Sequence, residues 1–177
     1  MPSDAPTTKT LDRLIKAYNT MLGRVEKTIR EAEKDALPRL EHNIDAAKEK
    51  AMELEELTRE EAEKVGTYLQ RDLHDAANYL AETGSELGDW LRFDLELIED
   101  RLLDSFTGLV DQTRLELQEL AQEAMQYGEW HTGEIAGIGT LRCQSCGELL
   151  HFHATGHIPP CPACHSTRFK RISTDDE

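Results

Sequence analysis

The sequence has few aromatic residues and no long apolar run. Aromatic side chains make up 6 % of the 177 residues, and hydrophobic residues make up 38 %. No segment approaches the run of about 18 apolar residues that would cross a membrane as a helix. The first ten residues are polar and give no sign of a secretory segment. We therefore expect a soluble, cytoplasmic protein that does not associate with membranes.

The common catalytic motifs are also missing. The sequence has no Gly-rich phosphate loop, no nucleophile elbow and no HExxH zinc-protease motif. A di-metal helical bundle needs Glu-x-x-His pairs, and neither His42 nor His74 follows a Glu at that spacing. We therefore expect no enzymatic activity, and we interpret a cluster of carboxylates on one predicted helix as a solvated face: Asp94, Glu96, Glu99, Asp100 and Asp104.

Cysteine is scarce but strongly patterned. The chain has four cysteines in two CxxC pairs with fourteen residues between the pairs: Cys143, Cys146, Cys161 and Cys164. Two thiolates one short turn apart hold one side of a metal ion, and a second pair completes the tetrahedron that suits zinc. We predict that these four residues bind one structural Zn²⁺. Four thiolates leave no open position for substrate or water, which argues against zinc catalysis.

Other uses of these residues compete with zinc. Disulfides are disfavoured because nothing indicates an oxidising compartment, and a redox CxxC would be expected beside a βαβ pattern that the sequence lacks. An iron-sulfur site is a further alternative. Four histidines of the same segment could be alternative ligands or could titrate near neutral pH: His151, His153, His157 and His165. Since the cysteines already fill the shell, we interpret them as exposed strand and loop residues.

The residues around the cysteines suit a small zinc ribbon. A turn after the second cysteine of each pair needs a permissive backbone, and Gly147 and His165 occupy those positions. The segments 149–153 and 167–172 are typical of short strands. Because so small a region contains little apolar material, we expect the metal to supply most of its folding free energy.

The chain before the cysteines is predicted to be helical. From Thr8 to Ala36 the apolar residues are spaced alternately four and three apart: Leu11, Ile15, Tyr18, Leu22, Val25, Ile29, Ala32 and Ala36. This heptad spacing indicates a helix packed along another helix, in either a dimeric coiled coil or an intramolecular bundle. We favour the bundle because three further amphipathic segments, 37–54, 62–81 and 86–127, are available to cover the seam. The last would reach roughly 60 Å at about 1.5 Å per residue.

Two signals divide this helical region. Thr58 and Glu61 have the spacing of a capping box, and Gly84 with Ser85 offers a break before the last helix. We therefore predict a mainly α fold, an elongated antiparallel helical bundle or coiled coil followed by a small C-terminal β zinc ribbon. Residues 1–128 would form an acidic helical domain. Residues 129–177 would form the zinc-ribbon domain, with a glycine-rich junction and a short polar tail.

Charge is distributed unevenly along the chain. The net charge is −15, and residues 1–128 carry 29 acidic and 16 basic side chains. The ribbon is different, because residues 141–172 contain one acidic residue, Glu148, and four basic ones: Arg142, Arg168, Lys170 and Arg171. An acidic body repels phosphate backbones, and a small basic face attracts them only weakly. A nucleic-acid role would have to rest on the ribbon.

Three stretches carry a family resemblance. The runs GEWHTGEIAGIGTLRCQSCG, IPPCPAC and ELTREEAEKVGTYLQRDL together resemble the bacterial zinc-ribbon-containing family of uncharacterised proteins typified by YbeL. The resemblance covers nearly the whole chain. It implies a helical N-terminal region and a C-terminal zinc ribbon, with Cys143, Cys146, Cys161 and Cys164 at the four metal positions. It implies no known activity.

These observations favour a non-enzymatic zinc-binding protein that acts as a protein-interaction or adaptor module. Its partner would be an unidentified protein, and Trp90 could anchor that partner. The alternative is a nucleic-acid, ribosome or transcription accessory factor that acts through the basic face of the ribbon. The protein itself would be a monomer, or a homodimer through the helical domain.

Overall fold

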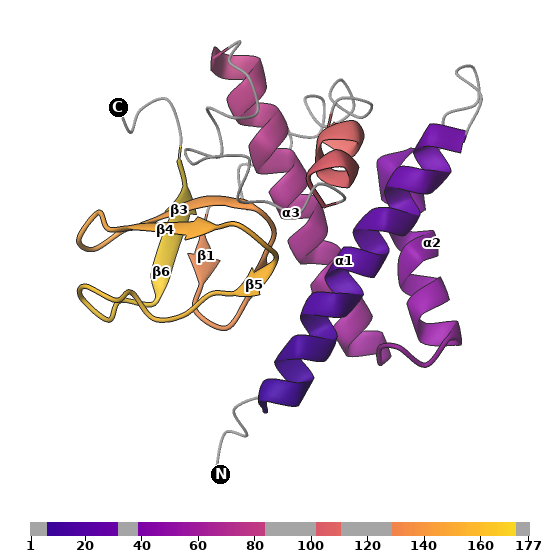
Figure 1. Cartoon of the computed structure of the whole chain (residues 1–177), viewed down its shortest axis with the longest axis horizontal. Coiled ribbons are helices and arrows are strands. Elements are labelled where there is room, and N and C mark those ends of the chain that lie inside the picture. Colours follow the sequence, from indigo (N-terminus) through magenta and orange to yellow (C-terminus); the bar gives the residue numbers. More distant parts are fainter. Residues whose placement is uncertain (1–6, 32–38, 84–101, 111–128, 173–177) are drawn as a thin grey trace.

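The fold is seen in a computed structural model that describes residues 7–31, 39–83, 102–110 and 129–172, with side chains 77–83 left aside. Figure 1 shows the helices on one side of the molecule and the small β region on the other. This is the predicted order of a helical part followed by a ribbon. In the described ranges, every helix is too short or too polar to cross a membrane.

Three long helices build most of the helical part. They are α1 (Thr8–Glu31), α2 (Leu40–Glu53) and α3 (Arg59–Thr83), and residues 102–110 form a further helical segment. The predicted capping box begins α3. The Glu61 amide donates to Thr58 Oγ1 over 3.3 Å, and the Thr58 amide donates to Glu61 Oε2 over 2.9 Å. Two of the amides that a helix start leaves without helical partners are thereby satisfied.

The apolar seam of α1 is covered by the chain itself. Tyr18, Leu22, Val25 and Ile29 are buried in one cluster with residues of α2, α3 and segment 102–110, while Ile15 packs at its edge. In the described residues the chain's own bundle covers the seam, as we favoured, and the monomeric state stays a prediction. The predicted helix 86–127 lies mostly outside the described residues, as do Trp90, Asp94, Glu96, Glu99 and Asp100. Asp104 is described and exposed.

The β region consists of two antiparallel sheets. The larger sheet has the strand order β1 (Trp130–His131), β6 (Arg168–Arg171), β3 (Gly139–Cys143) and β4 (Leu149–Phe152). The smaller sheet pairs β2 (Ile135–Ala136) with β5 (Gly156–His157). The two strands predicted beside the cysteines are confirmed as β4 and β6.

Side chains alternate between two faces of the larger sheet. The register pairs Arg142 with both Leu149 and Lys170, and it pairs Trp130 with Phe169. Because neighbouring residues of a strand point to opposite faces, each set of paired residues shares one face. The inner face forms a buried apolar cluster that includes Trp130, Leu141, Cys143, Leu150 and Phe169.

The ribbon packs directly against the helices. Figure 1 shows α1 and α3 between the sheets and α2, and β2 contacts α3 while β5 contacts α1. Ile135 and Ile138, which follow the predicted boundary at residue 128, are buried in the apolar cluster of the helices. The division into domains 1–128 and 129–177 stays a prediction, but residues from both ranges form one apolar core.

Candidate metal centre

Two turns place the four cysteine sulfurs together. Cys143 ends β3, Cys146 lies in the turn that follows, and Cys161 and Cys164 lie in a second turn before β6. All four Sγ atoms lie within 4.8 Å of one another, and the pairs 143/164 and 146/161 are each 3.6 Å apart. A zinc tetrahedron with bonds of about 2.3 Å has sulfur to sulfur edges of roughly 3.8 Å. The donor set therefore fits one zinc ion.

Both turns have the same backbone geometry. Gly147 and His165 follow their cysteine pairs with φ angles of 80° and 61°, as the sequence predicts. The Gly147 amide donates to the Cys143 carbonyl over 3.0 Å, and the His165 amide donates to the Cys161 carbonyl over 2.8 Å. Each turn therefore closes on its own backbone and presents two thiols to a common point.

The backbone also stabilises thiolate at this point. Burial raises the pKa of the Cys143 thiol, but the amides of Cys146 and Ser145 point at its sulfur and outweigh burial, so that the pKa falls to about 6. The amides of Glu148 and Ser166 act in the same direction on Cys146 and Cys164, but the neighbouring cysteine sulfurs and burial outweigh them and raise the pKa of both thiols, that of Cys146 to about 12. Because thiolate is the form that binds metal, these amides favour metal binding.

The ribbon histidines lie outside the cysteine group. In the part of the chain that the structure describes, the only cluster of potential ligands is the four cysteines. His151 Nδ1 lies 2.9 Å from Thr140 Oγ1, and burial together with the neighbouring His153 lowers the pKa of its ring. His165 is exposed in the second turn. His151 is exposed as well, whereas His153 and His157 are half-buried, so the expected exposure holds for two of the four histidines.

A buried polar network that the sequence analysis missed joins the ribbon to the helices. At its centre is Asp72 of α3, which is fully buried. Asp72 Oδ2 accepts hydrogen bonds from Tyr18 Oη over 2.6 Å and from the Gly137 amide over 2.7 Å, and Oδ1 forms an ion pair with Arg171 of β6. Burial raises the pKa of Asp72 while Arg171 opposes that effect. Since all three partners are donors, the geometry suits the ionised carboxylate.

Trp130 forms a second layer of the same joint. Its ring is fully buried, and two guanidinium groups lie over it, with Cζ of Arg71 4.2 Å and Cζ of Arg171 5.0 Å from the ring centroid. Its Nε1 donates to Asp75 Oδ2 over 3.0 Å. Arg71 also donates to the Glu129 carbonyl and pairs with Glu134 over 3.2 Å. The start of the ribbon is therefore bound to α3 through charge, hydrogen bonds and ring stacking.

The joint depends on one glycine of the junction. A Cβ atom at Gly137 would lie 2.5 Å from Tyr18 Oη and 3.1 Å from Asp72 Oδ2. Any side chain would therefore displace one of these two groups, which both donate or accept in the network. The sequence showed only that the junction is rich in glycine, whereas the structure shows that Gly137 allows close approach of the backbone to Asp72.

The structure corrects the predicted basic face. Arg171 is 8 % exposed and points inward to Asp72, whereas Arg168 is exposed and Arg142 and Lys170 are half-buried. Summing charges along the sequence ignored the alternation of the strand, which sends Arg168 and Lys170 to one face and Phe169 and Arg171 to the other. The burial of Asp72 could also have been predicted from the sequence. Asp72 lies at helical spacing from the apolar residues Val65, Leu69 and Ala76, and so on the apolar face of its helix.

The fold and the site together define a helical protein with a C-terminal ribbon that carries one structural zinc. The chain belongs to the family described as "Zinc-ribbon containing domain", whose model matches residues 27–173. It is 27 % identical over 165 residues to the uncharacterised protein YbeL of Escherichia coli strain K12. These aligned residues cover 91 % of this chain and 97 % of YbeL. YbeL of strains O6:H1 and O157:H7 matches to the same extent. No solved structure matches the chain significantly.

Proposed function

We propose that this protein is a non-enzymatic, cytoplasmic protein-interaction or adaptor module, with Cys143, Cys146, Cys161 and Cys164 as the ligands of its zinc. The closed shell of four thiolates supports a structural role, because it leaves no position for a substrate or an activated water. In this role the zinc holds the ribbon in shape, and the ribbon presents a surface to a partner protein.

One observation carries the choice of a protein partner over nucleic acid. The aromatic rings of the larger sheet belong to the inner-face cluster, where Trp130 and Phe169 are fully buried and Phe152 is half-buried. Sheets that bind single strands use exposed aromatic rings to stack bases. Among the described strands, the outer face has no Phe, Tyr or Trp ring, and the net charge of −15 opposes phosphate at long range.

Affinity purification with and without nuclease tests this function. The full-length, zinc-loaded protein serves as bait, and we expect the same proteins to be retained after nuclease treatment. Loss of all retained proteins on nuclease treatment would contradict the proposal and favour the alternative, an accessory factor for nucleic acid, the ribosome or transcription. Duplex DNA binding at physiological salt should be weak or undetectable, since few cations face outward.

A further inference from the structure

A hollow of about 420 Å³ lies between α1 and α2. Its walls are residues spaced three or four apart, so that one face of each helix lines it. They include Arg24, Lys27 and Glu31 of α1 and Ala46, Ala47 and Lys50 of α2. The short side chains of the two alanines leave the space open. Because small-molecule sites measure about 300 to 1,000 Å³, the hollow is large enough for a ligand.

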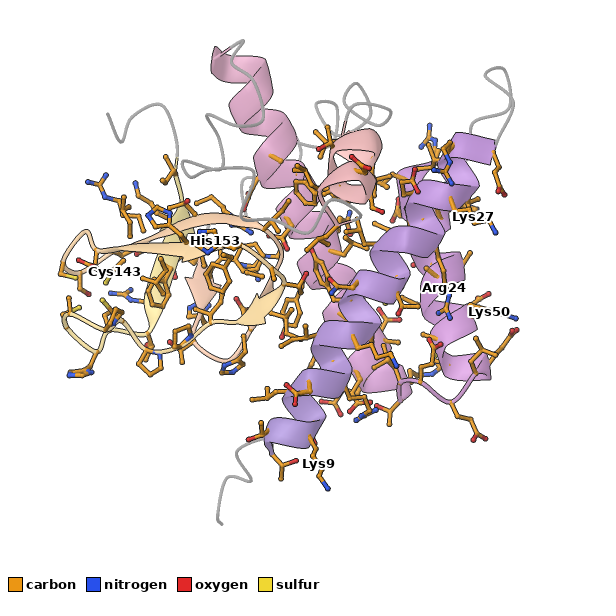
Figure 2. The ribbon with its side chains drawn as sticks, in the orientation of Figure 1. Lys9, Arg24, Lys27, Lys50, Cys143 and His153 are labelled. Atoms are coloured by element: carbon orange, nitrogen blue, oxygen red, sulfur yellow. The ribbon has the colours of Figure 1, made fainter. Side chains whose placement is uncertain are left out.

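Charge is unevenly distributed along this hollow. Figure 1 shows α1 and α2 running in opposite directions, and Arg24 pairs with Glu56 just beyond the end of α2, so Arg24 lies at the same end as Lys50. Figure 2 shows Arg24, Lys27 and Lys50 together there, and we call these three residues the cationic end. Among the described lining residues, Glu31 is the one carboxylate, and it lies about 10 Å farther along α1 than Arg24. The hollow therefore has one positive and one negative end.

The three cations differ in how firmly they are already paired. Arg24 donates two hydrogen bonds of 2.8 Å to Glu56, which fix the guanidinium and leave its other N–H donors available. Lys50 Nζ lies 3.1 Å from Glu53, but both side chains are more than half exposed, and such surface pairs are weak. Lys27 has no ion pair or hydrogen bond of its side chain with any described residue. An anion could therefore bind Lys27 without breaking an existing ion pair.

The chemistry of the cationic end suits a phosphate group. Lysine is a common partner of phosphate as a point charge, and guanidinium donors match phosphate oxygens. A phosphate monoester has three acceptor oxygens and nearly two negative charges, so it can contact cations on both walls at once. Glu31 at the other end repels a second anionic group and accepts hydrogen bonds. The far end of a ligand should therefore carry an N–H or O–H donor.

We propose that the hollow between α1 and α2 binds a small phosphate ester, with its phosphate at the cationic end and a hydrogen-bond donor toward Glu31. The organic part of the ester lies over Ala46 and Ala47. This site goes beyond the proposed protein-interaction function and does not depend on it. A long polyanion such as RNA is disfavoured, because the net charge of −15 repels it over its whole length.

Calorimetric titration with adenosine 5′-monophosphate tests the site in the zinc-loaded, full-length protein. This ester carries a phosphate at one end and an amino group at the other. We expect saturable binding with a Kd of about 1 mM or below, weakened by added salt. Inorganic phosphate should bind at least about threefold more weakly, because it lacks the organic part. Adenosine should not bind detectably, because it lacks the charge.

Removing two charges tests the cationic end. Lys27→Met/Lys50→Met keeps the apolar stems of both side chains, and we expect it to weaken binding of adenosine monophosphate at least about fivefold. Both lysines are exposed, so helical circular dichroism and zinc content should stay at parental values. Equal binding by the parent and this variant would refute the assignment of the phosphate to the cationic end.

The matched control removes two charges elsewhere. In Lys9→Met/Lys64→Met, one lysine again has no partner among the described residues, and the other again forms an exposed surface pair, here with Glu60. Figure 2 shows Lys9 at the opposite end of α1 from Lys27. This control should bind adenosine monophosphate within about twofold of the parent, because distant exposed charges are screened by salt.

A third variant fills the hollow without changing charge. Ala46 is exposed on α2, and leucine is a good helix former, so Ala46→Leu should leave the fold intact. We expect it to weaken adenosine monophosphate at least about fivefold while inorganic phosphate still binds, because the new side chain occupies the space of the organic part. Unchanged binding of the nucleotide would place it outside the hollow.

Three further results would overturn the proposal. The first is the absence of saturable binding of adenosine monophosphate. The second is equally tight binding of adenosine monophosphate, inorganic phosphate and sulfate, which would leave only a nonspecific attraction for anions. The third is tighter binding of a twelve-nucleotide single-stranded RNA that Lys27→Met/Lys50→Met abolishes, which would assign the cationic end to nucleic acid.

Discussion

Asp72 of α3 and Arg171 of β6 form a buried ion pair across 99 positions of sequence, and this pair connects the helical part to the strand that leaves the second cysteine turn. Leu141 pairs with Arg171 on the neighbouring strand, two residues before Cys143. A few residues of β3 and β6 thus connect the metal centre to the helices. The four predictions that follow test this arrangement and the packing around it.

Breaking the pair from one side should be costly. Asp72→Asn leaves the Arg171 charge buried without its main partner, and we expect a loss of about 3 to 5 kcal/mol in the free energy of unfolding. Arg171→Met should also destabilise, whereas the double variant should lose less than the sum of the two single variants by at least about 1 kcal/mol. Urea unfolding of the three proteins measures the coupling. Additive losses would show that the two side chains do not stabilise each other.

Asp75 should make stability depend on pH. Burial, opposed by Arg171 and the Trp130 hydrogen bond, raises the pKa of Asp75 from 3.8 to about 6. The folded protein therefore holds a proton that the unfolded chain has released between about pH 4 and 6. The protonated Asp75 therefore stabilises the folded protein fully below about pH 4, and this stabilisation is lost as pH rises through about 6. The full pKa shift of Asp75 corresponds to at most about 3 kcal/mol of unfolding free energy. The Asp75 side chain is 17 % exposed, and solvent screening reduces this energy.

The variant Asp75→Asn isolates this effect. Unfolding by urea at several values between pH 4 and 7 should show that the free energy of the parent, relative to the variant, declines as pH rises. Zinc release at low pH acts on both proteins and cancels in the difference. A constant difference across this range would mean that Asp75 does not titrate there.

Loss of zinc should weaken the helices as well as the ribbon. Elemental analysis of the parent should find about one zinc per chain, and Cys161→Ser should lose it because one of the four thiolates is gone. Since Ile135 and Ile138 belong to the helical core, we expect the melting temperature followed by helical circular dichroism to fall too. Ala163→Ser, at an exposed position between Cys161 and Cys164, is the control and should retain zinc. Full zinc retention by Cys161→Ser would exclude Cys161 as a ligand.

Leu22 should be essential for the monomer. Leu22 is 1 % exposed in the seam of α1, so Leu22→Glu buries a carboxylate. We expect this change to lower the free energy of unfolding by about 3 kcal/mol or more. Lys27→Glu, at an exposed position of α1, should have little effect. Light scattering should find the parent monomeric at micromolar concentration. A dimeric parent together with a monomeric, fully helical Leu22→Glu variant would instead identify the seam as a dimer interface.

Local rules in the sequence determined much of this protein. The CxxC spacing predicted which cysteines meet, since each pair closes within a single turn and needs positive φ only at Gly147 and His165. The capping box of Thr58 and Glu61 and the apolar spacing of α1 were also readable, because hydrogen bonds and side-chain contacts three or four residues apart decide them.

Only the tertiary structure decided how the two parts meet. Asp72, Arg171, Tyr18 and Gly137 are far apart in sequence, and a charged residue on an apolar helix face does not reveal which partner satisfies it. The direction of Arg171 also depended on the strand register, which assigns alternate residues to opposite faces and so removed one cation from the basic face that the sequence predicted. Burial of a carboxylate is stable only where several donors converge, and that convergence is a property of the packed chain rather than of any local segment.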